Sequence, residues 1–378
     1  MLPAPKPDRL SLADVMPSCL STVVGEGNRL GLPPGKRAVV LLVDGLGSAA
    51  LKARAGHART LISRLGKRSV IESGFPTTTA AAIATIMTGT APGQHGLVGY
   101  SALDTVNDRV VNMLSGWDKR IEPAAWQLER TVFERAAARG VGAVSIGPER
   151  FRKSGFSAAV LRGSTYVGAK TIQERAEVAV EWLRTSGENS LVYVYVPELD
   201  MASHATGWQS QEWTEALESL DHAVRTLEAG LAADDGMIVT ADHGVLDVPA
   251  HGHVLFDSSP GLIEGVRHVA GEPRCLQLHF EPGLGESDRA ALVQRWRDSE
   301  SNRAWVATRA EATGAGWFGT VTPEVEPRIG DVLVAARKQI AYYDGRTADD
   351  RALAMVGQHG SWTPAELNVP LLRFGAFA

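Results

Sequence analysis

Cysteine is scarce in this sequence of 378 residues: only Cys19 and Cys275 occur, far apart and without a CxxC motif. This scarcity excludes a disulfide-rich scaffold and a zinc site built from thiolates, and it is typical of a reducing cytoplasm. No apolar run approaches the ~18 residues of a membrane-spanning helix, so we expect no membrane span. Lys6 and Arg9 are not followed by an apolar segment. We therefore expect no signal peptide and a cytoplasmic protein.

An excess of positive charge is also missing. Lys and Arg total 38 and Asp and Glu total 43, which leaves a formal net charge of −5. This balance argues against a protein that coats nucleic acid. With 44% hydrophobic and 21% charged residues, the composition is that of an ordinary globular protein and excludes wholesale disorder. The length suggests two domains, or one large α/β domain with an insertion.

Three short apolar runs stand out in the first 250 residues, at 38–43 (AVVLLV), 191–196 (LVYVYV) and 237–241 (MIVTA). Runs of this length and β-branched content favour strands that are buried on both faces of a parallel sheet. A further strand is predicted over 141–146. Helical patterns lie between these strands, at 48–54, 59–65, 131–139, 171–184 and 211–233. The alternation predicts an α/β fold with a doubly wound, mostly parallel sheet.

The pattern changes after residue 250. Short strands are predicted over 266–270, 274–280, 303–308 and 332–336, with a helix over 287–298. We interpret residues 251–350 as a smaller, cap-like α+β insertion. Residues 1–250 and 351–378 would then form the core.

Each of the three strongest strands is followed by a carboxylate: Asp44 after the first, Asp200 after the second and Asp242 after the third. Ligand sites in open α/β sheets gather outside the carboxyl ends of the strands. A single Asp in such a place is as easily a turn residue. Three of them, two with histidines nearby, favour one shared site.

The histidines strengthen this interpretation. Asp200 and His204 are four residues apart, which places both on one face of a helical turn, and His243 directly follows Asp242. His359 lies between glycines in GQHG, although a lone histidine is more often structural. Carboxylate and imidazole ligands without thiolates suit zinc, manganese or iron. Three buried carboxylates would repel one another, and two divalent cations would offset that repulsion.

A candidate nucleophile lies in the segment 74–96, GFPTTTAAAIATIMTGTAPGQHG. Thr77, Thr78 and Thr79 precede a run rich in Ala and Ile, so Thr79 is expected at or just before a helix N-terminus, where phosphate is attracted. A small residue such as Ala80 would let a phosphorus atom approach closely. The competing interpretation is that one of these threonines is only an N-cap.

Taken together, these pieces resemble the alkaline phosphatase superfamily, in particular its type I phosphodiesterase/nucleotide pyrophosphatase branch. The matching motifs occur in the family's order: VDGLG (43–47), FPTTTA…TGTAPGQHG (75–96), LDMASH (199–204), ADHG (241–244) and GQHG (357–360). The resemblance implies an alkaline phosphatase-like core with two divalent metal ions, most often Zn²⁺, with Mn²⁺ or iron as alternatives. It implies one metal held by Asp200, His204 and His359, and the other held by Asp44, Thr79, Asp242 and His243.

The resemblance further implies hydrolysis of a phosphate diester or pyrophosphate bond in a small-molecule phosphate ester, through a phospho-threonine at Thr79. Hydrolysis of phosphonates or phosphomonoesters by the same centre, a phosphomutase and a non-catalytic metal-binding module are the alternatives. Tyr100 falls where nucleotide pyrophosphatases carry an asparagine that helps to bind the phosphoryl oxygen. We expect Ala80, Tyr100 and His253 to contact the substrate, and His95 to support the loop. The sequence leaves the oligomeric state open.

Overall fold

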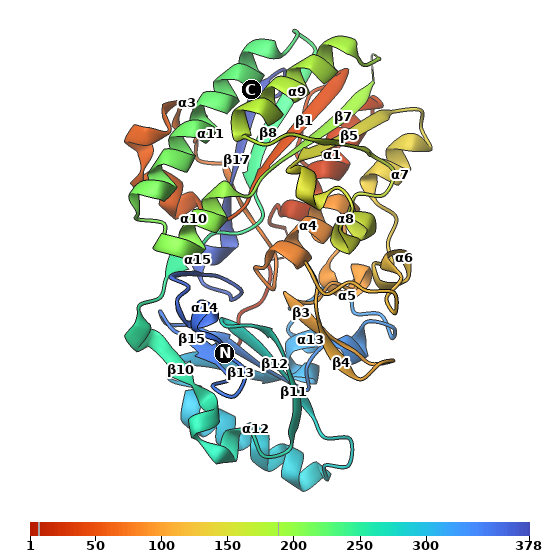
Figure 1. Cartoon of the computed structure of the whole chain (residues 1–378). Coiled ribbons are helices and arrows are strands. Elements are labelled where there is room, and N and C mark those ends of the chain that lie inside the picture. Colours follow the sequence, from red (N-terminus) through yellow and green to blue (C-terminus); the bar gives the residue numbers. More distant parts are fainter. Residues whose placement is uncertain (7, 188) are drawn as a thin grey trace.

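The computed structural model describes residues 1–6, 8–187 and 189–378. The strands of its central sheet are β1 (Arg37–Val43), β2 (Val70–Glu72), β5 (Gly142–Gly147), β6 (Thr165–Gly168), β7 (Ser190–Val196), β8 (Asp235–Ala241) and β17 (Asn368–Gly375). They are arranged in the order β2-β17-β8-β1-β7-β5-β6 (Figure 1). The strands from β8 to β6 run parallel, whereas β17 runs antiparallel to β8 and to β2. The predicted α/β class with a mostly parallel sheet is confirmed.

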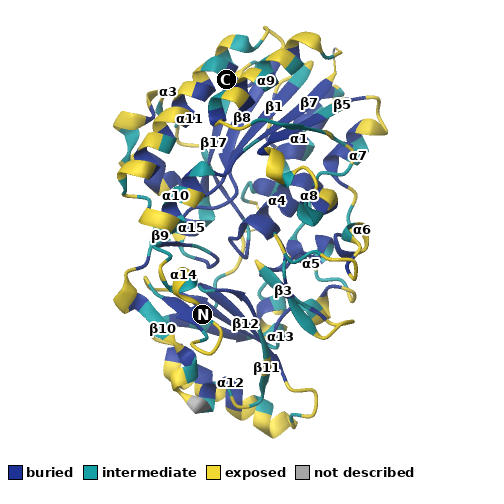
Figure 2. Cartoon of the chain, in the orientation of Figure 1, coloured by how far each residue is buried: buried dark blue, intermediate teal, exposed yellow. Residues whose placement is uncertain are grey.

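Helices cover both faces of this sheet. On one side lie α3 (Arg59–Ser63), α9 (Ile172–Thr185), α10 (Glu198–Thr206) and α11 (Gln211–Gly230), and on the other α1 (Val15–Val23), α4 (Thr79–Thr88), α7 (Val132–Ala137) and α8 (Gly155–Val160) (Figure 1). The strands between them are buried, and the exposed residues lie mainly on the outer faces of the helices (Figure 2). In β8 every residue is buried, and in β1 every residue after Arg37. This agrees with strands covered on both faces.

The register of the central strands brings their carboxyl ends to one edge. Val43, the last residue of β1, pairs with Val196 at the end of β7 and with Ala241 at the end of β8. The residues that follow these three strands therefore emerge side by side.

A second, antiparallel sheet contains β11 (Val266–Glu272), β12 (Cys275–Phe280), β13 (Ala304–Thr308) and β14 (Val332–Ala336), in the order β11-β12-β14-β13. The helix α12 (Glu286–Glu300) packs on it, and the two share an apolar core that includes Leu278, Leu292, Trp296 and Val334. The strands and the helix predicted after residue 250 are all present. Beside them, β10 (His253–Leu255) pairs with β15 (Ala341–Tyr343).

Several short elements were not predicted from the sequence. These are the hairpin β3 (Ser101–Asp104) and β4 (Arg109–Asn112), the pair β9 (Leu246–Asp247) and β16 (Gly357–Gln358), the helices α5 (Pro92–His95), α6 (Pro123–Trp126), α13 (Arg309–Gly314), α14 (Asp350–Leu353) and α15 (Pro364–Leu367), and single turns of 3-10 helix such as η3 (Glu149–Phe151). The helix predicted over 48–54 is present as α2 (Ser48–Ala53). Within the described residues, no helix has both the length and the apolar character needed to cross a membrane.

A fully buried ion pair joins the second sheet to the C-terminal segment. The Arg274 guanidinium donates to both oxygens of Glu366, with Nε–Oε1 2.7 Å and Nη2–Oε2 2.9 Å, and both side chains are 0% exposed. Glu366 also accepts from the backbone N–H of Ser361 at 2.9 Å. Because Ser361 lies two residues after His359, this pair holds the loop that carries His359 against the second sheet.

Arg274→Met should lower the free energy of unfolding by about 3–5 kcal/mol, because it leaves the Glu366 carboxylate buried without its cation. Urea denaturation of the variant and the wild type measures the difference. Arg184→Met is the matched control, since Arg184 is 70% exposed and its pair with Glu181 contributes little. The double variant Arg274→Met/Glu366→Leu should recover part of the loss. Equal stability of Arg274→Met and the wild type would contradict a structural role for the pair.

Candidate metal centre and active site

Asp44 and Asp242 follow the ends of β1 and β8. The backbone N–H of Asp44 still donates to Val196 O at 2.9 Å, which continues the sheet for one residue. The carboxylate Oδ1 of Asp242 accepts from the N–H groups of Gly45 at 3.1 Å and His243 at 2.9 Å. The start of the turn after β1 and the turn after β8 are therefore tied together, and one oxygen of Asp242 is held in place.

Asp200 and His204 come from α10, which begins two residues after β7. They lie on the same face, as the spacing predicts, and His204 Nε2 is 3.1 Å from Asp200 Oδ2. The start of α10 is fixed by Arg175, a fully buried side chain that donates to Tyr195 O at 2.9 Å and also to Glu198. Arg175 thus fixes the first turn of α10 relative to the end of β7.

His359 comes from a segment that is distant in the sequence. The pairing of β16 with β9 positions it, and Thr77 fixes it from the other side. Its Nδ1 lies 2.8 Å from Thr77 O, and the N–H of Gly360 donates to Thr77 Oγ1 at 3.1 Å. His359 Nε2 then lies 3.8 Å from Asp200 Oδ1, and its ring stacks on that of His243 with centroids 3.7 Å apart.

The three histidines share one arrangement. In each, Nδ1 faces a backbone carbonyl: Gly357 O at 2.7 Å for His204, Thr77 O at 2.8 Å for His359 and Gly244 O at 3.3 Å for His243. A carbonyl oxygen only accepts hydrogen bonds, so Nδ1 carries a proton, and in the neutral imidazole the lone pair then lies on Nε2. Metal-binding histidines are oriented in this way. The Nε2 atoms all point toward carboxylates.

The structure separates the three consecutive threonines. Thr77 binds the His359 loop, since its hydroxyl also donates to Ser361 O at 2.7 Å. Thr78 occupies the N-cap position of α4, although its side chain makes no capping hydrogen bond. Thr79 is the first residue of α4, and its Oγ1 lies 3.2 Å from His243 Nε2. Free N–H groups and the positive end of the helix dipole therefore lie beside the Thr79 hydroxyl and Ala80.

Three carboxylate oxygens at this centre are buried and have no hydrogen-bond partner among the residues that the structure describes: Asp44 Oδ1, Asp200 Oδ1 and Asp242 Oδ2. Burial and the charges of Asp242 and Asp200 raise the pKa of Asp44 well above its usual value. Burial likewise raises the pKa of Asp242 to about 7. Buried polar atoms without partners are rare in proteins. Cations between these carboxylates would give the oxygens partners and offset the repulsion.

Two groups of side chains bring ligand atoms close enough to hold a metal ion. One is Asp44, Asp242 and His243, and the other is Asp200, His243 and His359, with all ligand atoms of a group within 4.8 Å of one another. His204 joins the second group through its contact with Asp200. The donor set has carboxylates and imidazoles but no thiolate, which fits zinc, manganese or iron. The predicted ligands thus meet in one place.

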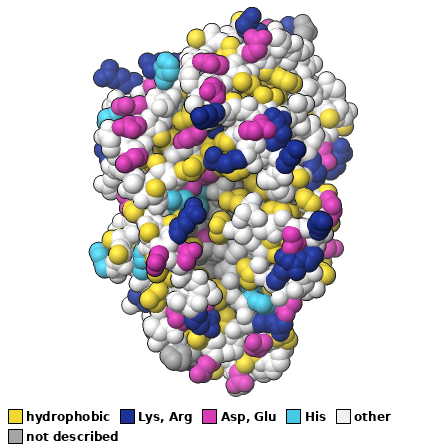
Figure 3. All heavy atoms as spheres, in the orientation of Figure 1, with side chains coloured by type: hydrophobic (Ala, Val, Ile, Leu, Met, Phe, Trp, Pro, Cys, Tyr) yellow, Lys and Arg dark blue, Asp and Glu magenta, His cyan; other side chains and the backbone are white. Residues whose placement is uncertain are grey.

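A cavity of about 1060 Å³ opens in front of this centre. Asp44, Thr79, Asp200, His204 and His359 line one side, and the rest of the wall includes aromatic and aliphatic side chains such as Phe151, Phe156 and Leu161. The molecular surface is hollowed between the large and the small sheet, and acidic and histidine side chains are visible at the hollow (Figure 3).

The three residues expected to contact the substrate lie at different distances from the cavity. Tyr100 lines the cavity and is 39% exposed, whereas Ala80 is fully buried in the first turn of α4. His253 lies one layer further back, because its ring packs on Tyr343, which lines the cavity, with centroids 4.9 Å apart. His95 is buried behind α4, where its Nε2 lies 3.0 Å from Thr85 Oγ1.

Two side chains at the site were not identified from the sequence. The Tyr195 hydroxyl donates to Asp44 Oδ2 and thereby leaves Oδ1 free. Glu272 reaches the cavity from the second sheet, where it accepts from the N–H of Tyr100 at 3.0 Å, and burial raises its pKa to about 8. The alternation in β7 marks Tyr195 as facing one side of the sheet, but no local pattern distinguishes Glu272.

Comparison with known proteins points to one family. Residues 38–362 match the type I phosphodiesterase / nucleotide pyrophosphatase family. An uncharacterized pyrophosphatase/phosphodiesterase of Schizosaccharomyces pombe is 26% identical over 181 residues, which cover 45% of this chain and 36% of that protein. The match therefore spans only about a third of the length of this curated relative.

Solved structures show the same fold. Murine ectonucleotide pyrophosphatase / phosphodiesterase 5, an inactive threonine-to-alanine variant in complex with AMP, superimposes with a TM-score of 0.69 at 16% identity, over 90% of this chain and 88% of that one. The human counterpart gives a TM-score of 0.68 at 14% identity, over 89% and 87% of the two chains. The family match covers most of the sequence, and the motifs are spread along the whole matched range. The chain therefore belongs to the type I phosphodiesterase / nucleotide pyrophosphatase family, a branch of the alkaline phosphatase superfamily.

Proposed function

We propose that this protein is a two-metal hydrolase that cleaves phosphate diester or pyrophosphate bonds through a phospho-threonine at Thr79. The observation that carries the proposal is the meeting of three unpartnered carboxylate oxygens and three available imidazole Nε2 atoms beside one threonine hydroxyl. Family membership and the AMP complex of the murine relative support a phosphate ester as substrate.

Asp200, His204 and His359 would hold one metal ion, and Asp44, Thr79, Asp242 and His243 the other. Zinc is our first choice, and manganese and iron suit the same ligands. Bound divalent cations lower the pKa of a coordinated hydroxyl and stabilise charge on phosphoryl oxygens.

The residues of the chain supply the nucleophile and its surroundings. Thr79 Oγ1 attacks phosphorus, the ester oxygen on the opposite side leaves, and hydrolysis of the phospho-threonine then regenerates Thr79. The free N–H groups of the first turn of α4 stabilise the charge on the phosphoryl oxygens. Tyr195 holds Asp44 in one orientation through its hydrogen bond. The apolar part of the cavity accommodates the leaving group.

Thr79→Ala should abolish turnover of bis-p-nitrophenyl phosphate, because no hydroxyl remains to attack phosphorus, while most of the metal content is retained. Steady-state rates and elemental analysis of the purified variant check both statements. The control is Thr85→Val, which removes another buried hydroxyl of α4 that does not line the cavity. Near-normal turnover by Thr79→Ala would reject Thr79 as the nucleophile.

The wild type should prefer a diester over the monoester p-nitrophenyl phosphate, because a cavity of about 1060 Å³ is larger than a phosphoryl group requires. Rates with both esters, a phenylphosphonate ester and a thymidine monophosphate ester, each with zinc, manganese or chelator, separate the candidate activities. Preference for the monoester or the phosphonate would support the alternative hydrolases. No turnover of any ester by the metal-loaded protein would support a non-catalytic metal-binding module.

His359→Ala should weaken the binding of one metal ion by about 10-fold or more, since it removes an imidazole ligand. Metal titration monitored by calorimetry measures the change. His253→Ala is the control, because His253 packs on Tyr343 instead of facing the carboxylates. An unchanged metal-to-protein ratio and affinity in His359→Ala would remove His359 from the ligand set.

Tyr195→Phe should weaken metal binding by about 10-fold, as expected when an outer hydrogen bond to a metal ligand is lost. The variant removes one hydroxyl and keeps the ring that packs in the sheet. Tyr166→Phe is a close control: it removes a second hydroxyl from the same cavity, but one that donates to Pro148 O. Equal metal affinities of the two variants would show that Tyr195 does not position Asp44.

A further inference from the structure

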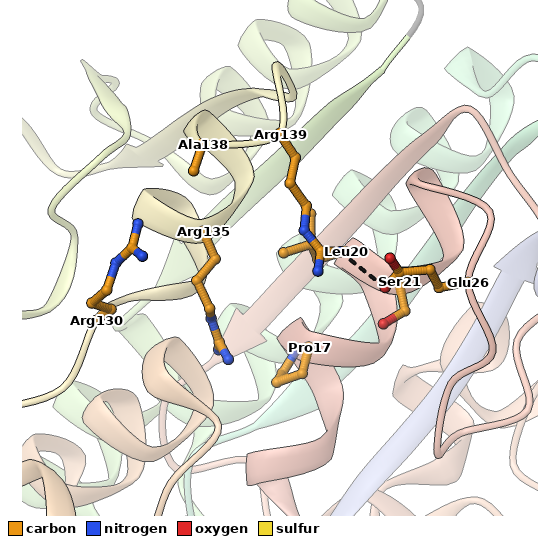
Figure 4. A pocket seen from close by; sticks show the side chains of 8 residues that line it. All are labelled: Pro17, Leu20, Ser21, Glu26, Arg130, Arg135, Ala138 and Arg139. Carbon is orange, nitrogen blue, oxygen red and sulfur yellow. Dashed lines mark hydrogen bonds and ion pairs between the residues drawn. The ribbon is translucent and has the colours of Figure 1, made fainter.

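A second cavity lies on the surface between α1 and α7, with a volume of about 490 Å³. Three arginines line it: Arg130 before α7, Arg135 within it and Arg139 after it. Opposite them, α1 contributes Pro17, Leu20 and Ser21, and Glu26 follows that helix. Figure 4 shows Arg135 and Arg139 extending from the α7 side toward the residues of α1, with Arg130 beside α7 at the edge of the cavity.

The three guanidinium groups have far more donors than partners. Each arginine has five N–H donors, but we find three hydrogen bonds between these groups and the described residues. Arg130 donates to Glu134 O at 3.3 Å, Arg135 to Thr88 O at 2.7 Å and Arg139 to Glu26 Oε2 at 2.9 Å. The Nε of Arg135 is buried and has no partner among the described residues. A buried donor of this kind calls for an acceptor.

The local charge is also unbalanced. Burial, and then the charges of Arg139 and Arg130, lower the pKa of Arg135, while Glu129 opposes them. Glu26 is the acidic residue that lines the cavity, and Arg139 already pairs with it. The Glu134 carboxylate caps α7 by accepting from the N–H of Thr131 at 2.8 Å. Three arginines therefore line one cavity in a chain whose overall net charge is −5.

We propose that this cavity is a binding site for a phosphorylated small molecule, with the phosphate oxygens held by Arg130, Arg135 and Arg139. Guanidinium groups match the geometry of phosphate oxygens, and several arginines around one cavity favour a group with more than one negative charge. The Ser21 hydroxyl offers a further donor. The volume exceeds the needs of a lone phosphate, and the apolar wall of Pro17 and Leu20 accommodates the rest of the ligand.

This site is separate from the metal centre. Thr88, whose carbonyl accepts from Arg135, is the last residue of α4, and Thr79 is the first. A helix of 10 residues is about 15 Å long. The ligand would therefore lie at the far end of α4, the helix that carries the proposed nucleophile. It would contact Arg135, which donates to the carbonyl of Thr88 at that end. Binding here depends on neither metals nor the activity of Thr79.

Calorimetric titration of the full chain with inorganic pyrophosphate, in the presence of EDTA, tests this proposal. EDTA removes the cations by which the metal centre would bind phosphate. The wild type should bind, and the double variant Arg130→Gln/Arg139→Gln should bind at least ~10-fold more weakly, which corresponds to the loss of a charged hydrogen bond. Arg135 stays intact in this design because it also contacts α4. Added salt should weaken wild-type binding, since exposed charges are screened.

The control is Arg120→Gln/Arg184→Gln, which removes two exposed arginines outside the cavity and should bind like the wild type. Thermal unfolding without ligand verifies that both double variants are folded, and the single variants Arg130→Gln and Arg139→Gln replace the double variant if it is not. The proposal is overturned if the wild type binds pyrophosphate only when metal is present, or if the arginine variants bind as tightly as the control. Failure of the hydrolase proposal would leave this result unchanged.

Discussion

Repulsion among three buried carboxylates is the constraint on which the rest of the site depends. Asp44, Asp200 and Asp242 lie within the same small volume, and each is less than a tenth exposed. Each keeps one oxygen that has no hydrogen-bond partner in the described part of the chain. A protein does not bury three acids in this way unless something offsets their charge. The neighbouring imidazoles direct Nε2 toward the same carboxylates, and together these groups form a donor set that divalent cations would complete.

Backbone contacts of the fold position these side chains. The in-register ends of β1, β7 and β8 bring Asp44, Asp242 and the start of α10 to one edge. The three histidines are each oriented by a carbonyl oxygen of a neighbouring segment. One of these carbonyls belongs to Thr77, so the loop with the proposed nucleophile and the loop with His359 are built as a unit. A change in either loop therefore affects both a ligand and the attacking hydroxyl.

The residues of the site that could be predicted from the sequence are those whose positions follow from local rules. Asp44 and Asp242 were predicted because each follows the end of a strongly apolar strand. Asp200 and His204 were placed on one face of α10 because they are four residues apart. His359 could be linked to them only through the family resemblance, because its position depends on the pairing of β16 with β9, a contact between residues far apart in the chain. Tyr195 and Glu272 were missed for the same reason. Their roles come from tertiary neighbours, and neither carries a local motif.

The second sheet contributes to the candidate active site as well as adding to the core. Glu272 and Tyr343 from its side line the cavity, and the Arg274–Glu366 pair holds the segment after His359. Glu272 brings a carboxyl group to the place where the backbone of Tyr100 passes the cavity, and Tyr100 stands where the resemblance to nucleotide pyrophosphatases implies an asparagine amide. An amide donates to a phosphoryl oxygen in every protonation state, but a carboxyl group does so only while it keeps its proton. The second sheet thus supplies a buried acid to the wall of the cavity, next to the carboxylates and imidazoles that the core supplies, and we propose that this acid takes part in substrate selection.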